Sequence, residues 1–338
     1  MEDDQLDTAA LGSYLAQYVP QIGQLRRFKK FSDGQSNPTY LLDTSCGQVV
    51  LRRQPPGELV KSAHAVDREF RVIEALRNSA VPVAREIHLC RDPEIIGSMF
   101  FLMSYEPGRI FWEPSLPELA LAERAAVYQE MNRVLAALHD IDVEAVGLAD
   151  FGKPGNYFER QVSRWSGQYR ASEAEPIPEM DRLIEWLPRN LPPDDAKVSL
   201  IHGDYRIDNI IFEMGRPRAR ALLDWELSTL GHPYADLAYQ CMQWRMPRDC
   251  IIPGFGTVDR EALGIPSEQD YVMQYCERRG LEPISHWNFY LVFGFFRFAA
   301  ILQGVLKRAL DGNASSPKAL EYGALAPVLA RQALSLID

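Results

Sequence analysis

The sequence predicts an α+β fold with two lobes: a small lobe built on an antiparallel sheet with one main helix, and a larger, mainly helical lobe. The chain has 338 residues, of which 46% are hydrophobic, and this length favours about two compact units. The first hundred residues hold short apolar runs separated by tight turns, which is typical of antiparallel strands. Beyond them, apolar residues recur mostly at helical spacing. We therefore expect one lobe over residues 1–105 and the other over residues 106–338.

The small lobe is expected to contain three strands, then a helix, then two further strands. The strands are the short runs at 24–31, 38–43, 49–52, 87–90 and 99–103. The helix is expected over residues 63–77, with Ser62 as its N-cap. Val66 and Ile73 lie on its apolar stripe, and Glu69 shares that face. Because a carboxylate on a core-facing stripe is costly alone, Glu69 is expected to have a partner.

The large lobe shows amphipathic stripes at helical spacing. A helix that can begin near Pro117 ends at His139, which we interpret as a structural histidine. A second helix carries Arg160 and Arg164 on one face, which is either an acid- or phosphate-binding wall or a solvated surface. Residues 170–195 are rich in Pro, Glu and Asp and are expected to form connecting surface.

The segment His-Gly-Asp-Tyr-Arg-Ile-Asp-Asn at residues 202–209 is the most informative part of the chain. It places Asp204 and then Asn209, and Asp224 follows behind a short apolar strand. A hairpin formed by residues 210–223 would bring Asn209 beside Asp224. A carboxylate that holds a hydroxyl, with an amide and a carboxylate that hold magnesium, is what phosphoryl transfer requires. The alternative is a polar hairpin whose side chains satisfy turns, and the combined spacing argues against it.

These residues resemble a known family. Protein kinases carry H-R-D-x-x-x-x-N and D-F-G, whereas here Gly203 replaces the Arg, and Trp225 and Glu226 replace Phe-Gly. The H-G-D-x-x-x-x-N form resembles the aminoglycoside phosphotransferase and choline kinase-like family. The resemblance implies a two-lobed protein-kinase-like fold, with ATP and Mg²⁺ as cofactors.

Further segments resemble the phosphotransferase domains that are associated with acyl-CoA dehydrogenases. They are the stretches at 31–40, 50–53, 55–57 and 157–165. This likeness implies a functional link to an acyl-CoA dehydrogenase.

The resemblance implies a role for each motif residue. Asp204 matches the base or hydroxyl-orienting residue, and Asn209 and Asp224 match the magnesium ligands. Arg52 stands where kinases have the strand lysine that pairs with the helix glutamate, here Glu69.

Some assignments stay open at this stage. Arg53 is an alternative to Arg52, and an ordinary strand-edge arginine with a boundary glutamate is a third reading. Asp236 matches the family's residue that binds backbone near the catalytic loop. Glu226 either assists at the metal or shapes the acceptor pocket.

Two segments of the small lobe are expected to contact the nucleotide. The turn at residues 32–37 would cover the phosphates, although it has one glycine where kinases have three, and a plain hairpin turn fits its local sequence equally well. The expected nucleotide-binding residues are Gly34, Gln35 and Ser36 in this turn, and the hinge residues Met103, Ser104 and Tyr105.

Composition excludes several classes of protein. A net charge of −10 argues against nucleic acid as a partner. Five cysteines without a C-x-x-C pair fit a reduced, cytoplasmic setting. The acidic N-terminus does not resemble a signal peptide, and the apolar window at 289–306 is expected to be a buried helix rather than a membrane span. A homodimer is left open.

The sequence thus predicts a phosphotransferase that moves the γ-phosphate of ATP to a hydroxyl on a small molecule, with GTP left open as the donor. The resemblance favours a hydroxyacyl compound or its CoA thioester as acceptor. One alternative is an aminoglycoside-type antibiotic kinase, and another is a nucleotide-binding pseudokinase with a regulatory role. A protein kinase is disfavoured because no A-P-E segment follows Asp224 before Gly231.

Overall fold

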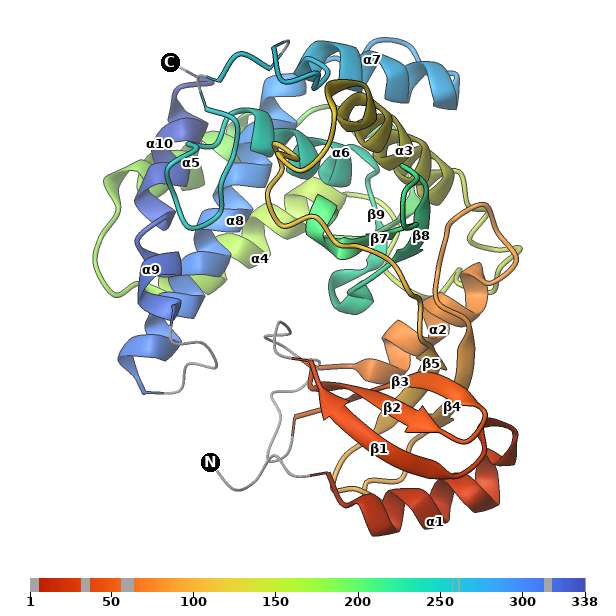
Figure 1. The fold of residues 1–338 in the computed structure, drawn as a ribbon. Helices are drawn as coiled ribbons and strands as arrows, with labels where there is room; N and C mark the ends of the chain where they lie inside the picture. The colour runs from red at the N-terminus through yellow and green to blue at the C-terminus, as the bar shows by residue number, and fades with distance from the viewer. Residues whose placement is uncertain are drawn as a thin grey trace. The chain divides into compact units, whose positions relative to one another are not determined.

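The computed structural model describes residues 6–31, 37–55, 64–256, 258–260, 262–312 and 318–337 (Figure 1). The chain forms two compact units. Unit 1 comprises Met1–Arg109, Ile211–Met214 and Arg220–Leu227, and unit 2 comprises Ile110–Ile210, Gly215–Ala219 and Ser228–Asp338. The first unit therefore includes short segments that follow the H-G-D motif, which a single boundary at residue 105 assigns to the second lobe.

Unit 1 contains a five-stranded antiparallel sheet at the five predicted positions. Its order is β1-β2-β3-β5-β4. The strands are β1 (Leu25–Lys30), β2 (Thr39–Thr44), β3 (Gly47–Arg53), β4 (Glu86–Cys90) and β5 (Phe100–Ser104).

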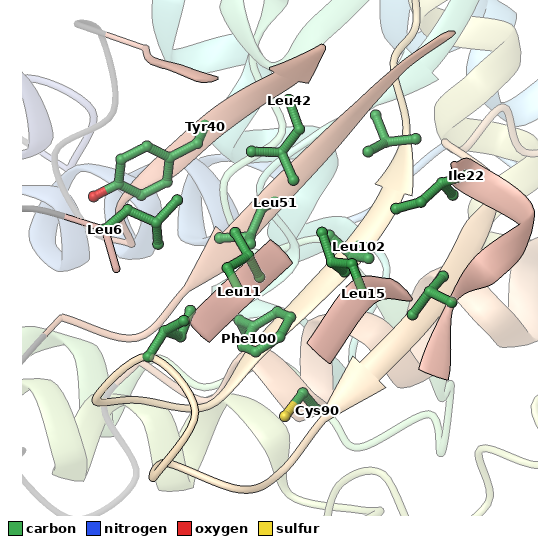
Figure 2. Packing of buried hydrophobic residues seen from close by; sticks show 13 residues of the cluster. Leu6, Leu11, Leu15, Ile22, Tyr40, Leu42, Leu51, Cys90, Phe100 and Leu102 are labelled. Atoms are coloured by element: carbon green, nitrogen blue, oxygen red, sulfur yellow. The ribbon is translucent and has the colours of Figure 1, made fainter. Parts of the chain in front are cut away.

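One face of this sheet is covered by helix α1 (Thr8–Tyr18), which the sequence analysis did not predict. Leu11 and Leu15 of α1 are fully buried in a cluster with Leu51 and Phe100 of the sheet (Figure 2). Asp7 caps α1 by accepting hydrogen bonds from the amides of the first turn.

Helix α2 (Val66–Leu76) is the main helix of unit 1 and contacts β4, β5 and the short helix η3 (Trp225–Leu227). Its buried residues include Val66, Ile73 and Glu69, as the apolar stripe predicts. The expected N-cap Ser62 lies outside the described residues, and the helix begins at Val66 rather than at residue 63.

Unit 2 is mainly helical. Its helices are α3 (Leu121–His139), α4 (Tyr157–Ser172), α5 (Pro178–Arg189), α6 (Tyr234–Cys241), α7 (Glu268–Arg279), α8 (Trp287–Leu310), α9 (Ala319–Gly323) and α10 (Ala326–Leu334). Strands β6 (Ser199–Ile201) and β9 (Thr229–Gly231) pair in antiparallel fashion. Between them in sequence lie η2 (Ile207–Asn209) and the paired strands β7 (Ile210–Phe212) and β8 (Ala219–Leu222).

Helix α8 runs through the core of unit 2 and packs against α4, α6 and α10. By length and composition alone it could cross a membrane, but 78% of its most apolar window is buried inside the protein. Its apolar sequence is therefore explained by the neighbouring helices.

The expectation of connecting surface over residues 170–195 is wrong, because α5 lies within that segment. Met180, Leu183 and Leu187 are fully buried and follow helical spacing. Pro178 in the first turn and the acidic residue Glu179 beside it are helix-start signals that the Pro- and Glu-rich composition concealed.

Candidate functional site

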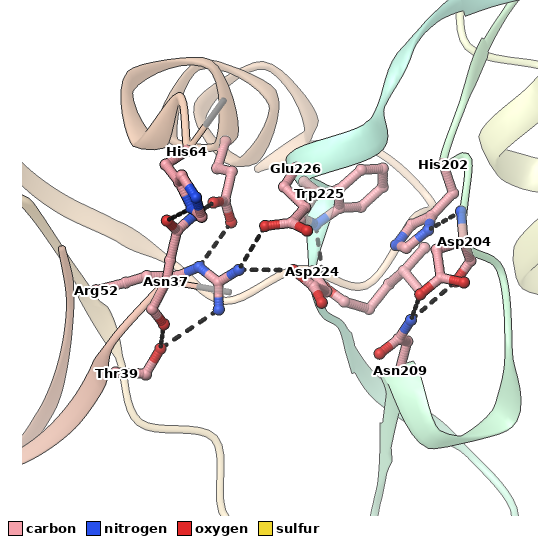
Figure 3. Close-up of polar contacts among 12 residues, drawn as sticks. Asn37, Thr39, Arg52, His64, His202, Asp204, Asn209, Asp224, Trp225 and Glu226 are labelled. Atoms are coloured by element: carbon pink, nitrogen blue, oxygen red, sulfur yellow. Dashed lines mark hydrogen bonds and ion pairs between the residues drawn. The ribbon is translucent and has the colours of Figure 1, made fainter. Parts of the chain in front are cut away.

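Arg52 of β3 and Glu69 of α2 form a buried ion pair in unit 1, as predicted. Arg52 Nε lies 2.9 Å from Glu69 Oε2, and the Glu69 side chain is only 2% exposed (Figure 3). Asn37 Nδ2 donates to the other oxygen of Glu69 at 2.7 Å. Burial raises the pKa of Glu69, and the Arg52 guanidinium and the Asn37 amide oppose that rise. Both oxygens of this carboxylate are therefore bound, which makes its burial tolerable.

The same guanidinium reaches two further carboxylates of unit 1. Arg52 Nη2 donates to Asp224 Oδ1 at 2.6 Å and lies 3.8 Å from Glu226 Oε2. Burial alone would lower the pKa of Arg52, but the charges of Glu69, Asp224 and Glu226 raise it. Arg52 thus remains a cation and links α2 to the segment after β8.

Arg53 points elsewhere, because successive side chains of a strand alternate between its faces. Its Nη1 donates to the carbonyl oxygen of Ile96 at 3.1 Å, and its guanidinium lies 5.8 Å from the ring centre of Tyr40. The residue that pairs with Glu69 is therefore Arg52.

Asp224 adopts a left-handed backbone conformation with φ of 62°, which aspartate tolerates better than most residues. Its side chain is 34% exposed, so one side of the carboxylate faces solvent while the other meets Arg52. The following Trp225 anchors this turn by donating from Nε1 to the carbonyl oxygen of Leu222 at 3.1 Å.

The H-G-D loop of unit 2 follows β6 and is held by Asp236 of α6. Asp236 accepts the His202 amide at 2.6 Å and the Gly203 amide at 2.8 Å. Burial alone would raise the pKa of Asp236, but hydrogen bonds from His139 and His202 lower it. Gly203 has φ of 86°, so the glycine that replaces the kinase arginine occupies a conformation that disfavours other residues.

These contacts confirm the structural roles expected for Asp236 and His139. Both side chains are buried, and His139 Nε2 lies 3.3 Å from Asp236 Oδ2. His139 Nδ1 lies 2.7 Å from the hydroxyl of Tyr275 on α7. Burial lowers the pKa of His139, which favours the neutral ring.

Asp236→Asn is expected to lower the stability of the protein by about 1–3 kcal/mol, because one of the two loop amides would face an NH₂ group and lose its acceptor. The free energy of unfolding from urea titration measures this loss. A value equal to wild type would mean that the loop amides do not depend on the Asp236 carboxylate.

Asp204 lies next to Gly203, and donors from two other elements bind both of its oxygens. Asn209 Nδ2 donates to Oδ2 at 3.0 Å (Figure 3). Tyr239 of α6 donates its hydroxyl to Oδ1 at 2.8 Å. Arg206 Nε lies 3.3 Å from Oδ1. Burial alone would raise the pKa of Asp204, but Arg206 and the hydrogen bonds outweigh it and lower the pKa. Asp204 is thus an oriented carboxylate that is ionised at neutral pH.

The residues predicted to hold magnesium have suitable donor chemistry. Asn209 Nδ2 also donates to the Asp204 carbonyl oxygen at 2.8 Å, which turns the amide oxygen away from Asp204 (Figure 3). Asp224 offers a partly exposed carboxylate. Among the described residues there is no cluster of three or more His, Cys, Asp or Glu side chains suited to a metal. A magnesium site needs only one or two protein oxygen ligands, because water and phosphate complete the coordination shell of Mg²⁺.

Other predicted site residues are placed as follows. Gly34, Gln35 and Ser36 lie outside the described residues. The expected hinge residues Met103, Ser104 and Tyr105 stand at and just after the end of β5, where Ser104 donates its backbone amide to the carbonyl oxygen of Arg85 at 2.8 Å.

Arg160 serves the loop before α4. It donates to the carbonyl oxygens of Lys153 at 2.6 Å and Pro154 at 3.3 Å. Arg164 is exposed and stacks on Trp165, with its Cζ 5.6 Å from the ring centre. The acid- or phosphate-binding wall that the sequence suggested as one reading is therefore not supported for Arg160.

A cavity of about 220 Å³ in unit 2 contains none of the predicted site residues. Val198, which precedes β6, and Gly231, the last residue of β9, line this cavity. Ile201, which leads into the H-G-D loop, lies at the other end of β6. Of the cavity's two lysines, Lys153 and Lys197, the second lies 2.6 Å from Asp195 and is paired with that carboxylate.

Sequence reasoning missed Asn37 and Tyr239. Asn37 is adjacent to the turn that was expected to cover phosphates, and its contact with Glu69 joins positions 32 residues apart. Tyr239 follows Asp236 by three residues, so helical spacing places both on one face of α6. That spacing was the available signal for Tyr239.

Comparison with known proteins shows the family to which the chain is related. The model of the phosphotransferase enzyme family matches residues 27–263. The chain is 49% identical over 305 residues to acyl-CoA dehydrogenase family member 10 of Mus musculus, a match that covers 90% of this chain and 28% of that protein. The chain spans less than half the length of the curated relatives it matches.

Solved structures confirm the predicted protein-kinase-like fold. A protein of Ralstonia eutropha assigned to the aminoglycoside phosphotransferases is 46% identical, with a TM-score of 0.89 over 98% of both chains. The aminoglycoside phosphotransferase APH(4)-Ia, solved with AMP-PNP and hygromycin B, is 15% identical, with a TM-score of 0.63 over 97% of this chain and 98% of that one. The second likeness concerns the fold alone. Together with the relatives above, these matches confirm the family resemblance.

Proposed function

The chain belongs to the phosphotransferase enzyme family, and we propose that it is an ATP-dependent kinase that transfers the γ-phosphate to a hydroxyl group of a small molecule. The observation that carries this proposal is Asp204, a half-buried carboxylate with a lowered pKa whose two oxygens are bound by Tyr239 and Asn209. An oriented anion of this kind suits the alignment of an attacking hydroxyl.

In the proposed reaction the acceptor oxygen forms a bond to the γ-phosphorus, and the bond from that phosphorus to the leaving oxygen of ADP breaks. The proton of the acceptor hydroxyl passes to Asp204. Because the pKa of Asp204 is lowered, the carboxylate is a weak base. Its main contribution is therefore to orient the hydroxyl, with proton transfer late in the reaction.

In this proposal Asp224 and Asn209 hold magnesium, which would neutralise charge on the phosphates. Arg52 holds the Asp224 carboxylate at 2.6 Å and contributes positive charge of its own for the phosphates. Gly34, Gln35 and Ser36 would complete the phosphate contacts, and the backbone from Met103 to Tyr105 would bind the adenine.

Asp224→Ala is expected to remove the magnesium-dependent part of the rise in melting temperature that ATP causes. A ligand that binds only the folded state stabilises it by an amount that grows with the logarithm of its concentration divided by its Kd, about 2.7 kcal/mol at a concentration 100 times its Kd. The measurement is thermal unfolding with ATP, with and without Mg²⁺, for wild type and the variant. Equal, metal-independent shifts in both proteins would favour a regulatory nucleotide-binding protein over a kinase.

We further propose that the acceptor is a hydroxyacyl compound, free or as its CoA thioester. Two observations support this choice: the 49% identity to a protein named as an acyl-CoA dehydrogenase family member, and the cations near Asp204. Arg206 lies 3.3 Å from the carboxylate, and Arg297 binds the adjacent Gly203. In this proposal, guanidinium groups beside Asp204 disfavour a polycationic aminoglycoside and suit an anionic substrate.

All five cysteines are free thiols, in keeping with the cytoplasmic location that we propose. A functional link to an acyl-CoA dehydrogenase belongs to the same proposal.

The experiment is a screen of purified protein with ATP or GTP, Mg²⁺ and four acceptor classes: kanamycin-type aminoglycosides, choline, homoserine and hydroxyacyl-CoAs. Mass spectrometry would detect the phosphorylated product, and Asp204→Asn is the blank. Phosphorylation of hydroxyacyl compounds supports the proposal. Efficient turnover of a cationic amine without any acyl compound would overturn the acceptor and leave the kinase assignment intact.

A further inference from the structure

We propose that Tyr239 and Arg297 are positioning residues for Asp204: Tyr239 orients its carboxylate, and Arg297 fixes the loop that carries it. This inference rests on the proposed function, since it assigns Asp204 a role in the reaction. Neither residue belongs to the H-G-D motif or to the segment from Asp224 to Glu226.

Tyr239 binds the carboxylate oxygen of Asp204 that Asn209 does not bind. Its side chain is 5% exposed, and its hydroxyl donates to Asp204 Oδ1 at 2.8 Å. Asn209 ends the short helix η2, five residues after Asp204, whereas Tyr239 belongs to helix α6, so the two donors reach the carboxylate from different elements. With the Tyr239 hydroxyl removed, Asn209 would remain on Oδ2 and Arg206 beside Oδ1, but Oδ1 would lose its hydrogen bond from α6 and rotation of the carboxyl group would be less restricted.

The helix that carries Tyr239 also carries the anchor of the loop backbone. Asp236 accepts the amides of His202 and Gly203, and Tyr239 stands three residues later on the same face of α6. Helix α6 therefore fixes both the position of the backbone before Asp204 and the orientation of the Asp204 side chain.

Arg297 binds this arrangement from helix α8. Its side chain is buried, and Nη2 donates to the carbonyl oxygen of Gly203 at 2.7 Å. Its Cζ lies 5.5 Å from the ring centre of Tyr239 and 5.6 Å from that of Trp165. The guanidinium thus contacts the loop and both aromatic rings at once, and cation–π attraction is strengthened by burial.

The burial of Arg297 requires compensating interactions. An arginine in the interior of an apolar helix is costly unless it is paired, and Arg297 makes no ion pair among the described residues. Its hydrogen bond to the carbonyl oxygen of Gly203, directly before Asp204, and its packing on the Tyr239 ring stabilise this buried cation. Because Arg297 contacts both parts of the Asp204 support, its loss should loosen both.

The test compares Tyr239→Phe with Tyr234→Phe, a matched loss of a buried hydroxyl on the same helix. The Tyr234 hydroxyl lies 3.2 Å from Lys197 Nζ and has no part in the proposed arrangement. The first readout is the pKa of Asp204 from ¹³C NMR of labelled carboxyl groups, with its resonance identified by its absence in Asp204→Asn. Tyr239→Phe should raise this pKa, because a donor to the ionised form is lost, and Tyr234→Phe should leave it unchanged.

The second readout is kinetic. With Mg²⁺, ATP and the hydroxyacyl-CoA set, Tyr239→Phe should lower kcat about 10- to 100-fold, the loss of one hydrogen bond to a charged group, with little change in the KM for ATP. Arg297→Met should lower kcat in the same manner, and Arg297→Lys, which keeps the charge, should recover part of it. Should Arg297→Met fail to fold, the Arg297→Lys and Tyr239→Phe results decide.

An unchanged Asp204 pKa and unchanged kcat in Tyr239→Phe would overturn the proposal for Tyr239. Wild-type kcat in folded Arg297→Met, or in Arg297→Lys if Arg297→Met does not fold, would overturn it for Arg297. A failure of the proposed function looks different: Asp204→Asn would then be as active as wild type, whichever way the NMR titration of Tyr239→Phe turned out.

Discussion

Asp204→Asn is expected to lower turnover about 100- to 10,000-fold while nucleotide binding stays close to wild type. The variant keeps the size of the side chain but removes the charge that orients the acceptor hydroxyl and the site that receives its proton. It also replaces an acceptor by an NH₂ group opposite either Tyr239 or Asn209, both of which donate to this carboxylate. The measurements are kcat with ATP and Mg²⁺, and ATP affinity by calorimetry.

A matched control is Asp208→Asn, which changes the charge by the same amount four residues later. Asp208 lies 3.2 Å from Arg206 Nη2 and does not contribute to the proposed chemistry. Its turnover should stay close to wild type. Near wild-type turnover in Asp204→Asn itself would show that the assignment of the site is wrong.

The pH dependence gives a second check on Asp204. Arg206, Tyr239 and Asn209 outweigh burial and hold the pKa of this carboxyl below its usual range. Because the ionised form is the competent one, kcat should stay constant through neutral pH and fall only on the acid side of the ordinary aspartate value of about 3.9. An acid limb well above that value, assigned to Asp204 by NMR, would contradict the observed hydrogen-bonding pattern.

The sequence was sufficient wherever a signal is local or depends on fixed spacing. The five strands of unit 1, the buried Glu69 on α2 and the H-G-D loop all follow from short patterns. The positive φ of Gly203 explains why this position has glycine where the kinase motif has arginine.

The sequence was insufficient where a side chain derives its role from distant partners. Arg297 lies in an apolar helix 94 residues from the Gly203 carbonyl that it binds, and no period in the sequence joins them. Helix α1 owes its place to the cluster with Leu51 and Phe100, which pattern reading of its own eleven residues does not reveal. Such roles depend on tertiary packing, and local propensity is silent about them.

Arg52→Met is expected to lower the free energy of unfolding by about 3–5 kcal/mol at neutral pH, because it leaves the buried carboxylate of Glu69 without its cation. Glu69 is 2% exposed and would keep only Asn37 among the contacts described above. The loss is measured by urea unfolding. Arg52→Lys should retain part of the stability, since it keeps the charge but not the geometry with which Arg52 reaches both Glu69 and Asp224.

The origin of this loss can be identified from its pH dependence. Burial raises the pKa of Glu69 above its unfolded value, and removal of Arg52 takes away the main opposing charge. A raised carboxyl pKa gives stability that is fully present below the unfolded pKa and is lost as pH rises through the folded pKa. The gap between wild type and Arg52→Met should therefore be small in acid and widen towards neutral pH. The double variant Arg52→Met/Glu69→Gln has no buried carboxylate at position 69 that would be left without a cation. In it, this widening should disappear and part of the stability should return. A gap that is the same at every pH would mean that Arg52 stabilises unit 1 through packing rather than through its charge.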